Sequence, residues 1–178
     1  MTYAVVAFYK AVGELFDHAV RIWEGGRYSH CEIVLPSGRW ISASPRDGGV
    51  RYVDNEMDLS KWDFVAIKVD DKPLAKATQW AATQEGKKYD WTGIFLSQIL
   101  PFCIENPRKF FCSEFCIHFF QRMNMLSEVI PQLHGPNGFY DELINQAVNY
   151  DVELILSRDK PYEYTEKVVR YPRPGVCY

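Results

Sequence analysis

The sequence predicts an α+β fold in which an antiparallel sheet, formed mainly by the first half of the chain, packs against helices from the second half. Short apolar segments separated by turn residues fill the chain up to residue 69, and helical periodicity dominates from residue 74 onward. The chain has 178 residues, of which 47% are hydrophobic and 15% aromatic, enough for one core. We therefore expect a single domain over residues 1–178, with a proline-bearing C-terminal tail from about residue 158.

The elements of the first half are predicted in order. An apolar run at 4–9 is typical of a strand, and apolar residues at helical spacing over 15–23 predict a helix that ends at Gly25. A turn at 36–38 indicates a β-hairpin. The further strands are expected at 28–35, 39–44, 50–53 and 63–69.

The second half is predicted to be mainly helical. The pattern over 112–123 is the strongest, because Phe115, Phe119 and Met123 share one stripe of a helix surface. The other expected elements are helices at 74–85, 91–100 and 140–148 and a last strand at 152–156.

Composition excludes several classes of function. The net charge is −3, so no basic patch for nucleic acid is expected, and no apolar run approaches the roughly 18 residues of a membrane span. The first residues lack the basic start of a signal peptide, which predicts synthesis in a cytoplasm. The five cysteines are irregularly spaced without a CxxC pair, so we expect no disulfide framework, no metal and no cofactor.

Cys112 is the main candidate for chemistry. It ends an apolar approach and begins the predicted helix, in the segment 110–117 (FFCSEFCI). Unpaired N–H groups and the helix dipole stabilise a thiolate at the start of a helix. The same N–H groups could donate hydrogen bonds to the oxyanion that forms during acyl transfer. The alternative is a buried structural cysteine.

His30 is the expected partner of Cys112, because an adjacent imidazole completes the activation of a thiol. In a strand, His30 and Glu32 share one face of an otherwise apolar segment, and Cys31 lies on the other face. For the residue that orients the imidazole we favour Ser42 on the next strand, with Ser44 and Glu32 as alternatives. Glu32 is disfavoured because two residues along a strand span ~6.6 Å.

Tyr89 is a further candidate, since a tyrosine after the predicted helix 74–85 could donate a hydrogen bond to an oxyanion; packing in a loop is the alternative. The apolar segment 91–102 could line an acyl-chain pocket, although a core helix explains it as well.

These motifs together resemble the circularly permuted, papain-like hydrolases of the NlpC type, the group that includes the YiiX-like bacterial proteins. The resemblance covers roughly residues 3–145, and the motifs follow the permuted order of that family. They are 29–34, 41–43, 48–51, 86–91 and 111–115.

The resemblance implies a papain-like core with Cys112 as nucleophile and His30 as general base. YiiX-like relatives tend to carry a glutamate where Ser42 stands in this chain. The segment 42–47 (SASPRD) resembles a small phage-encoded branch of the same family.

Two functions follow as expectations. The first is a cysteine hydrolase or acyltransferase acting on an amide or ester, with peptidoglycan peptides or lipid-like molecules as the substrates that the resemblance implies. The second is a non-catalytic binding module on the same fold, which the serine at position 42 favours.

Overall fold

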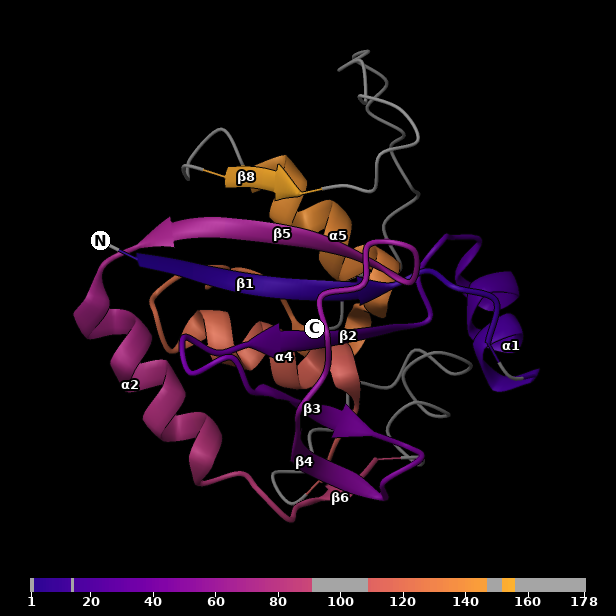
Figure 1. The fold of residues 1–178 in the computed structure, drawn as a ribbon, viewed down its shortest axis with the longest axis horizontal. Coiled ribbons are helices and arrows are strands. Elements are labelled where there is room, and N and C mark those ends of the chain that lie inside the picture. Colours follow the sequence, from indigo (N-terminus) through magenta and orange to yellow (C-terminus); the bar gives the residue numbers. More distant parts are fainter. Residues whose placement is uncertain (1, 14, 91–108, 147–151, 156–178) are drawn as a thin grey trace.

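The computed structural model describes residues 2–13, 15–90, 109–146 and 152–155 (Figure 1). In these residues eight strands form one sheet in the order β7-β6-β4-β3-β2-β1-β5-β8. The strands are β1 (Thr2–Tyr9), β2 (His30–Val34), β3 (Trp40–Ser44), β4 (Gly49–Val53), β5 (Trp62–Val69), β6 (Lys88–Tyr89), β7 (Lys109–Phe110) and β8 (Val152–Ile155). The helices are α1 (Leu15–Glu24), α2 (Asp71–Ala82), α4 (Cys112–Gln121) and α5 (Pro136–Asn145), with a 3-10 turn η1 (Pro131–Leu133).

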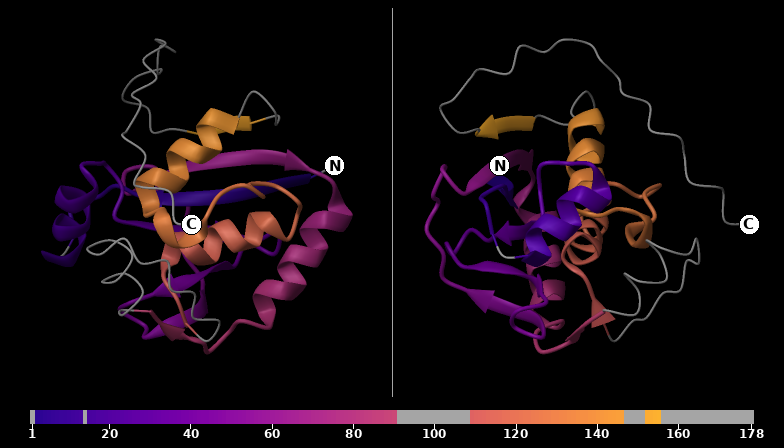
Figure 2. Two further views of the ribbon diagram at one scale, coloured as in Figure 1. Left: turned by 180° about the vertical axis from the view of Figure 1, so that it is seen from behind. Right: turned by 90° about the vertical axis from the view of Figure 1, so that its right-hand side faces the viewer.

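The predicted α+β class is confirmed. Neighbouring strands pair antiparallel throughout the sheet except for the short β6 and β7, which run parallel. The helices α4 and α5 lie on the same face of the sheet (Figure 2), and α4 packs directly on β2 and β3.

The two faces of β2 have different surroundings, as expected from the alternation of side chains along a strand. Cys31 and Ile33 belong to the main core together with the apolar side chains of α4. On the opposite face, Val34 packs against a smaller aromatic cluster that contains Trp40 and Trp62. The polar His30 and Glu32 lie on this second face, so β2 carries a core surface on one side and a polar surface on the other.

The start of α4 is held by a carboxylate. The N–H of Phe111 donates to Glu114 Oε2 at 3.3 Å, and the Gln132 amide donates to Glu114 Oε1 at 3.1 Å. A glutamate in the first turn also interacts favourably with the helix dipole. The buried pair of Glu114 and Gln132 thus fixes the point at which the helix begins, and with it the position of Cys112.

A close approach of backbones positions β6. A Cβ atom on Gly49 would lie 1.9 Å from the Lys87 carbonyl oxygen, so only glycine fits there. The Val50 N–H donates to that same oxygen at 2.8 Å, and the Tyr89 N–H donates to the Gly48 carbonyl at 2.9 Å. The contact sets the place of Tyr89 beside β4.

The boundaries differ from the expectation at a few points. α5 begins at Pro136 rather than at residue 140. Proline suits the first turn of a helix, because the N–H groups of that turn make no hydrogen bond within the helix and the lack of one costs nothing. The two-residue strands β6 and β7 are too short to produce a periodic pattern. The expected helix 91–100 and the tail from about residue 158 lie outside the described residues. No helix in the described part of the chain has both the length and the apolar character to cross a membrane.

Candidate active site

Cys112 is the first residue of α4, and its side chain is shielded, with 5% of the residue exposed. A hydrogen bond from the Cys31 thiol is the largest cause that lowers the pKa of Cys112. Burial opposes this, but the positive charge of His30 and a hydrogen bond to its ring add to the lowering, and the pKa lies well below the usual range for cysteine. These contacts therefore favour the thiolate form of Cys112 over the neutral thiol.

The His30 side chain lies at the start of β2 and is 16% exposed. Its Nε2 atom lies 3.2 Å from Glu32 Oε1, and its ring also hydrogen-bonds Cys112. Burial lowers the pKa of His30, but the Cys112 thiolate and the Glu32 carboxylate outweigh burial and raise that pKa to about 10. The two shifts act in the direction that favours a thiolate on Cys112 and an imidazolium on His30.

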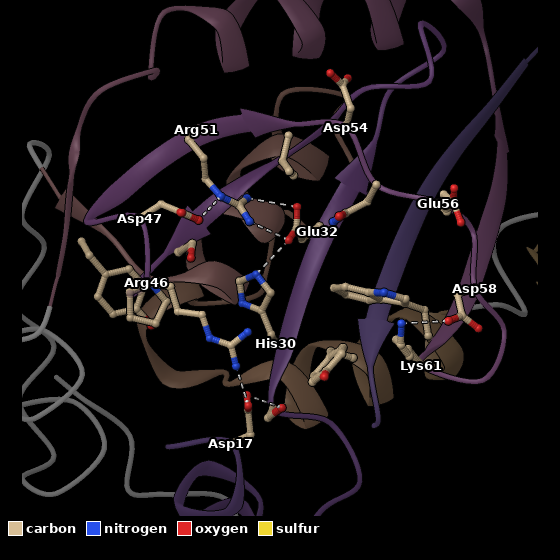
Figure 3. A pocket seen from close by; sticks show the side chains of 18 residues that line it. Asp17, His30, Glu32, Arg46, Asp47, Arg51, Asp54, Glu56, Asp58 and Lys61 are labelled. Atoms are coloured by element: carbon tan, nitrogen blue, oxygen red, sulfur yellow. Dashed lines mark hydrogen bonds and ion pairs between the residues drawn. The ribbon is translucent and has the colours of Figure 1, made fainter. Parts of the chain in front are cut away.

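Glu32 is buried and is held by Arg51 from β4 (Figure 3). Arg51 donates from Nη1 to Glu32 Oε2 at 3.0 Å and from Nη2 to Oε1 at 2.9 Å. Its Nε atom donates to Asp47 Oδ2 at 2.6 Å. Burial raises the pKa of Glu32, but His30 and Arg51 together lower it below its usual value, so the carboxylate stays charged beside the imidazolium.

The favoured third residue, Ser42, does not orient His30. Its hydroxyl is fully buried and donates to the Cys31 carbonyl at 2.7 Å. The other serine considered, Ser44, hydrogen-bonds Asp47, which lowers the pKa of that carboxylate. Glu32, the remaining alternative, is the residue in contact with the imidazole.

The argument against Glu32 was wrong for a geometric reason. The ~6.6 Å between alternate residues of a strand separates their Cα atoms. His30 and Glu32 point to the same side of β2, and both side chains are long enough to lean toward each other, so that Nε2 and Oε1 come within 3.2 Å.

Tyr89 lies close to the same group. Burial, and then the negative charge of Cys112, raise the pKa of Tyr89 well above its usual value, so the phenol keeps its proton. The structure places this side chain, 6% exposed, on the wall of a pocket that His30 also lines.

The pocket has a volume of about 520 Å³ and a strongly charged lining (Figure 3). Arg46 forms an ion pair with Asp17 at 2.6 Å, and Lys61 forms one with Asp58 at 3.2 Å. Asp54 and Glu56 add further negative charge to the rim. Cys112 does not contribute to this lining in the described residues; His30 lies between the pocket and the thiol.

The other three histidines do not belong to the group, and His18 is exposed on α1. His134 Nδ1 lies 2.9 Å from the Ile130 carbonyl oxygen, and its Nε2 lies 3.6 Å from Glu142. The ring of His118 lies against Trp80. Among the described residues, no group of three or more histidine, cysteine or acidic side chains is arranged to hold a metal ion.

A second polar network fixes the loop that precedes His30. The Asn137 side chain accepts from the Tyr28 N–H at 2.8 Å and donates to the Tyr28 carbonyl at 2.8 Å and to Glu24 Oε2 at 2.6 Å. Glu24 is half-buried, and its burial raises its pKa to about 7, with a contribution from the charge of Cys112. The network joins the end of α1 to α5 and anchors the residues that lead into β2.

Sequence reasoning missed Arg51, Asp47 and Cys31 as parts of the site. The pairing of β3 with β4 places Arg51 opposite Ser42, on the face that carries Glu32. The sequence does show a cation, Arg51, in the strand after Ser42. Placing it next to Glu32 requires the register of both the β2–β3 and the β3–β4 pairing, which the sequence does not give. Cys31 was assigned only to the core face of β2, because nothing in the sequence indicates which helix covers it.

A scan against models of known protein families matches none of them to this chain, and a search of curated proteins finds no match either.

Proposed function

We propose that this protein is a cysteine-dependent hydrolase or acyltransferase that acts on an amide or ester bond. One arrangement carries the proposal: Cys112 begins α4 beside His30, which lowers the pKa of the thiol, and His30 in turn contacts the buried Glu32. A nucleophile, a base and a residue that orients the base are the three parts of a cysteine hydrolase site.

The reaction would begin with attack of the Cys112 thiolate on the substrate carbonyl carbon. The first N–H groups of α4 have no acceptor within the helix and would donate to the developing oxyanion. The His30 imidazolium would give its proton to the leaving amine or alcohol, producing a thioester on Cys112. Neutral His30 would then take a proton from water, or from an acceptor alcohol or amine, as that group attacks the thioester.

Glu32 and Arg51 would hold the imidazole in place during both steps. The carboxylate balances the positive charge of His30 and limits rotation of its ring. Arg51 keeps Glu32 ionised through two hydrogen bonds. A carboxylate is therefore present beside the base, although position 42 is a serine. The serine at position 42 was the feature that favoured a non-catalytic binding module, and Glu32 weakens that argument.

We also propose that the fold is a circularly permuted papain-like core of the NlpC type. The support is the order of the motifs in the chain, with the His30 strand before the Cys112 helix, and the direct packing of α4 on β2. Two of the segments that resemble the family, 29–34 and 111–115, correspond to β2 and the start of α4, which meet at the site.

The pocket favours a polar, peptide-like substrate over a long acyl chain. Its described lining combines three cationic side chains, Arg46, Arg51 and Lys61, with several carboxylates, whereas a lipid pocket is predominantly apolar. The segment 91–102, considered for acyl binding, lies outside the described residues.

Reaction of Cys112 with iodoacetamide tests the proposal. We expect Cys112 to alkylate near neutral pH much faster than Cys116, which is fully buried one helical turn away, and we expect its labelling to be lost in Cys112→Ser. With a panel of amide and ester substrates, the wild type should form an acyl adduct on Cys112 that mass spectrometry detects. Cys112 reacting no faster than an ordinary exposed cysteine, together with no adduct, would identify a non-catalytic module instead.

A further inference from the structure

We propose that Asn137 is a positioning residue that sets where the His30 imidazole stands in the proposed site. Asn137 lies in the first turn of α5, and its side chain holds the backbone of Tyr28, two residues before His30. The inference rests on the proposed function for the role of His30, but it does not depend on the identity of the substrate.

His30 stands at the end of a strand ladder, where a backbone is least restrained. The pairing of β1 with β2 ends with Tyr9 opposite His30, and just before it the Ser29 N–H donates to the Tyr9 carbonyl at 3.1 Å. Tyr28 lies beyond this ladder and is buried, so its N–H and carbonyl groups need other partners. Without such partners the end of the strand would fray.

The Asn137 amide supplies both partners. Its Oδ1 atom accepts from the Tyr28 N–H at 2.8 Å, and its Nδ2 atom donates to the Tyr28 carbonyl at 2.8 Å. A residue of a neighbouring antiparallel strand would make the same two hydrogen bonds. The amide therefore takes the place of a strand at Tyr28 and fixes the backbone that leads into His30.

Glu24 fixes the orientation of this amide. Its Oε2 atom accepts from Asn137 Nδ2 at 2.6 Å and from the Asn137 backbone N–H at 3.0 Å. One Nδ2 hydrogen thus goes to Glu24 and the other to the Tyr28 carbonyl, and Oδ1 faces the Tyr28 N–H. A flipped amide would turn its NH2 group toward that N–H, so one orientation alone satisfies all three contacts. We call Asn137, Glu24 and the Tyr28 backbone the Asn137 clamp.

The start of α5 is a rigid support for the Asn137 clamp. Phe139 and Leu143 are buried on α5, and the Phe139 ring packs against Phe8 of β1 with ring centroids 5.5 Å apart. A misplacement of about 1 Å can cost an enzyme about a hundredfold in rate. The contacts of Asn137 therefore bear on the reaction, because they tie the backbone before His30 to the core.

The experiment follows the titration of the His30 ring by NMR in the full-length chain. Burial lowers the pKa of His30, but its charged neighbours outweigh burial and raise that pKa to about 10. In Asn137→Ala the ring should lose its place beside Glu32, and the pKa should fall by about one unit or more. The rate of acyl-adduct formation on Cys112 should fall by about tenfold or more.

Gly26→Ala is a second variant, and it removes no polar group. A Cβ atom on Gly26 would overlap the Asn137 amide, so the displaced amide should produce the same shift in the His30 titration. Two controls on α5 should leave that titration unchanged. Asn145→Ala alters the exposed end of the helix, and Leu143→Val weakens its packing without touching the Asn137 clamp.

An unchanged His30 titration in both clamp variants, or the same shift in Leu143→Val, would overturn the inference. If neither clamp variant folds, hydrogen exchange of the wild type decides. Slow exchange of the Tyr28 N–H supports the Asn137 clamp, and exchange as fast as that of the exposed Asn55 N–H overturns it. A shift in the His30 titration without any acyl adduct in the wild type refutes the hydrolase alone. An adduct without a shift in either clamp variant refutes the positioning role alone.

Discussion

His30 Nε2 lies 3.2 Å from Glu32 Oε1, although only one residue separates the two in the same strand. The contact places a buried carboxylate next to the imidazole that also hydrogen-bonds Cys112. Arg51, on the neighbouring hairpin, compensates the charge of Glu32, so the imidazole of His30, the carboxylate and the guanidinium form one continuous polar chain beside Cys112.

Glu32→Gln should reduce the reactivity of Cys112 at neutral pH by about tenfold or more, because an amide no longer stabilises the imidazolium that favours the thiolate. The measurement is the rate of iodoacetamide labelling against pH. Ser42→Ala is the matched control on the adjacent strand and should leave this pH profile unchanged, since the Ser42 hydroxyl donates to the Cys31 carbonyl. A profile that changes in Ser42→Ala and not in Glu32→Gln would contradict the assignment of Glu32.

Arg51→Met should lower the free energy of unfolding by about 2–4 kcal/mol, because Glu32 would stay buried without its cation. Chemical denaturation measures this loss. The double variant Arg51→Met/Glu32→Gln should recover part of it, because the uncompensated charge is gone. Purely additive effects of the two substitutions would show that the pair is not coupled.

The reactivity of Cys112 should be nearly constant across neutral pH. An ordinary cysteine gains thiolate as pH rises toward ~8.5, whereas the pKa of Cys112 is already well below that value. Alkylation rates between pH 6 and about 10 test this expectation.

His30 should stabilise the folded protein most at low pH, because folding raises its pKa from ~6.5 to about 10. This stabilisation is fully present below about pH 6.5 and is lost as pH rises toward about 10. Thermal unfolding over the same pH range measures the loss.

Glu24→Gln should raise the melting temperature above pH 7 and leave it nearly unchanged at about pH 4. Folding raises the pKa of Glu24 to about 7, so the folded chain binds a proton there that the unfolded chain releases, and stability falls as pH rises through this interval. The glutamine can still accept from the Asn137 N–H and side-chain amide, which the carboxylate binds at 3.0 and 2.6 Å. Equal melting temperatures of the two proteins at alkaline pH would refute the buried-acid interpretation.

Gly49→Ala should destabilise the protein by about 1–3 kcal/mol, because its new methyl group would overlap the Lys87 carbonyl and push β6 from β4. The displacement should also change the environment of Tyr89, which ultraviolet absorbance against pH can follow through the ionisation of the phenol. Ser37→Ala, in the exposed turn between β2 and β3, serves as the control and should have little effect on either reading.

Much of the fold could be predicted from local patterns. Alternation placed His30 and Glu32 on one face of β2 and Cys31 on the other, as the structure shows. The helix beginning at Cys112 followed from its apolar stripe, and the structure begins α4 at that residue. Short elements such as β6 escaped prediction because two residues carry no periodicity, and their backbone partners come from distant parts of the chain.

The sequence by itself determined the α+β class, the polar face of β2 and the thiol at the start of a helix, because each depends on the spacing of neighbouring residues. Tertiary structure alone decided that Glu32 rather than Ser42 contacts the imidazole and that Arg51 holds Glu32. It also decided that the Cys31 sulfur lies 3.8 Å from the sulfur of Cys116 on α4. These contacts depend on sheet register, on which helix covers which strand, and on the reach of long side chains, and local sequence spacing encodes none of them.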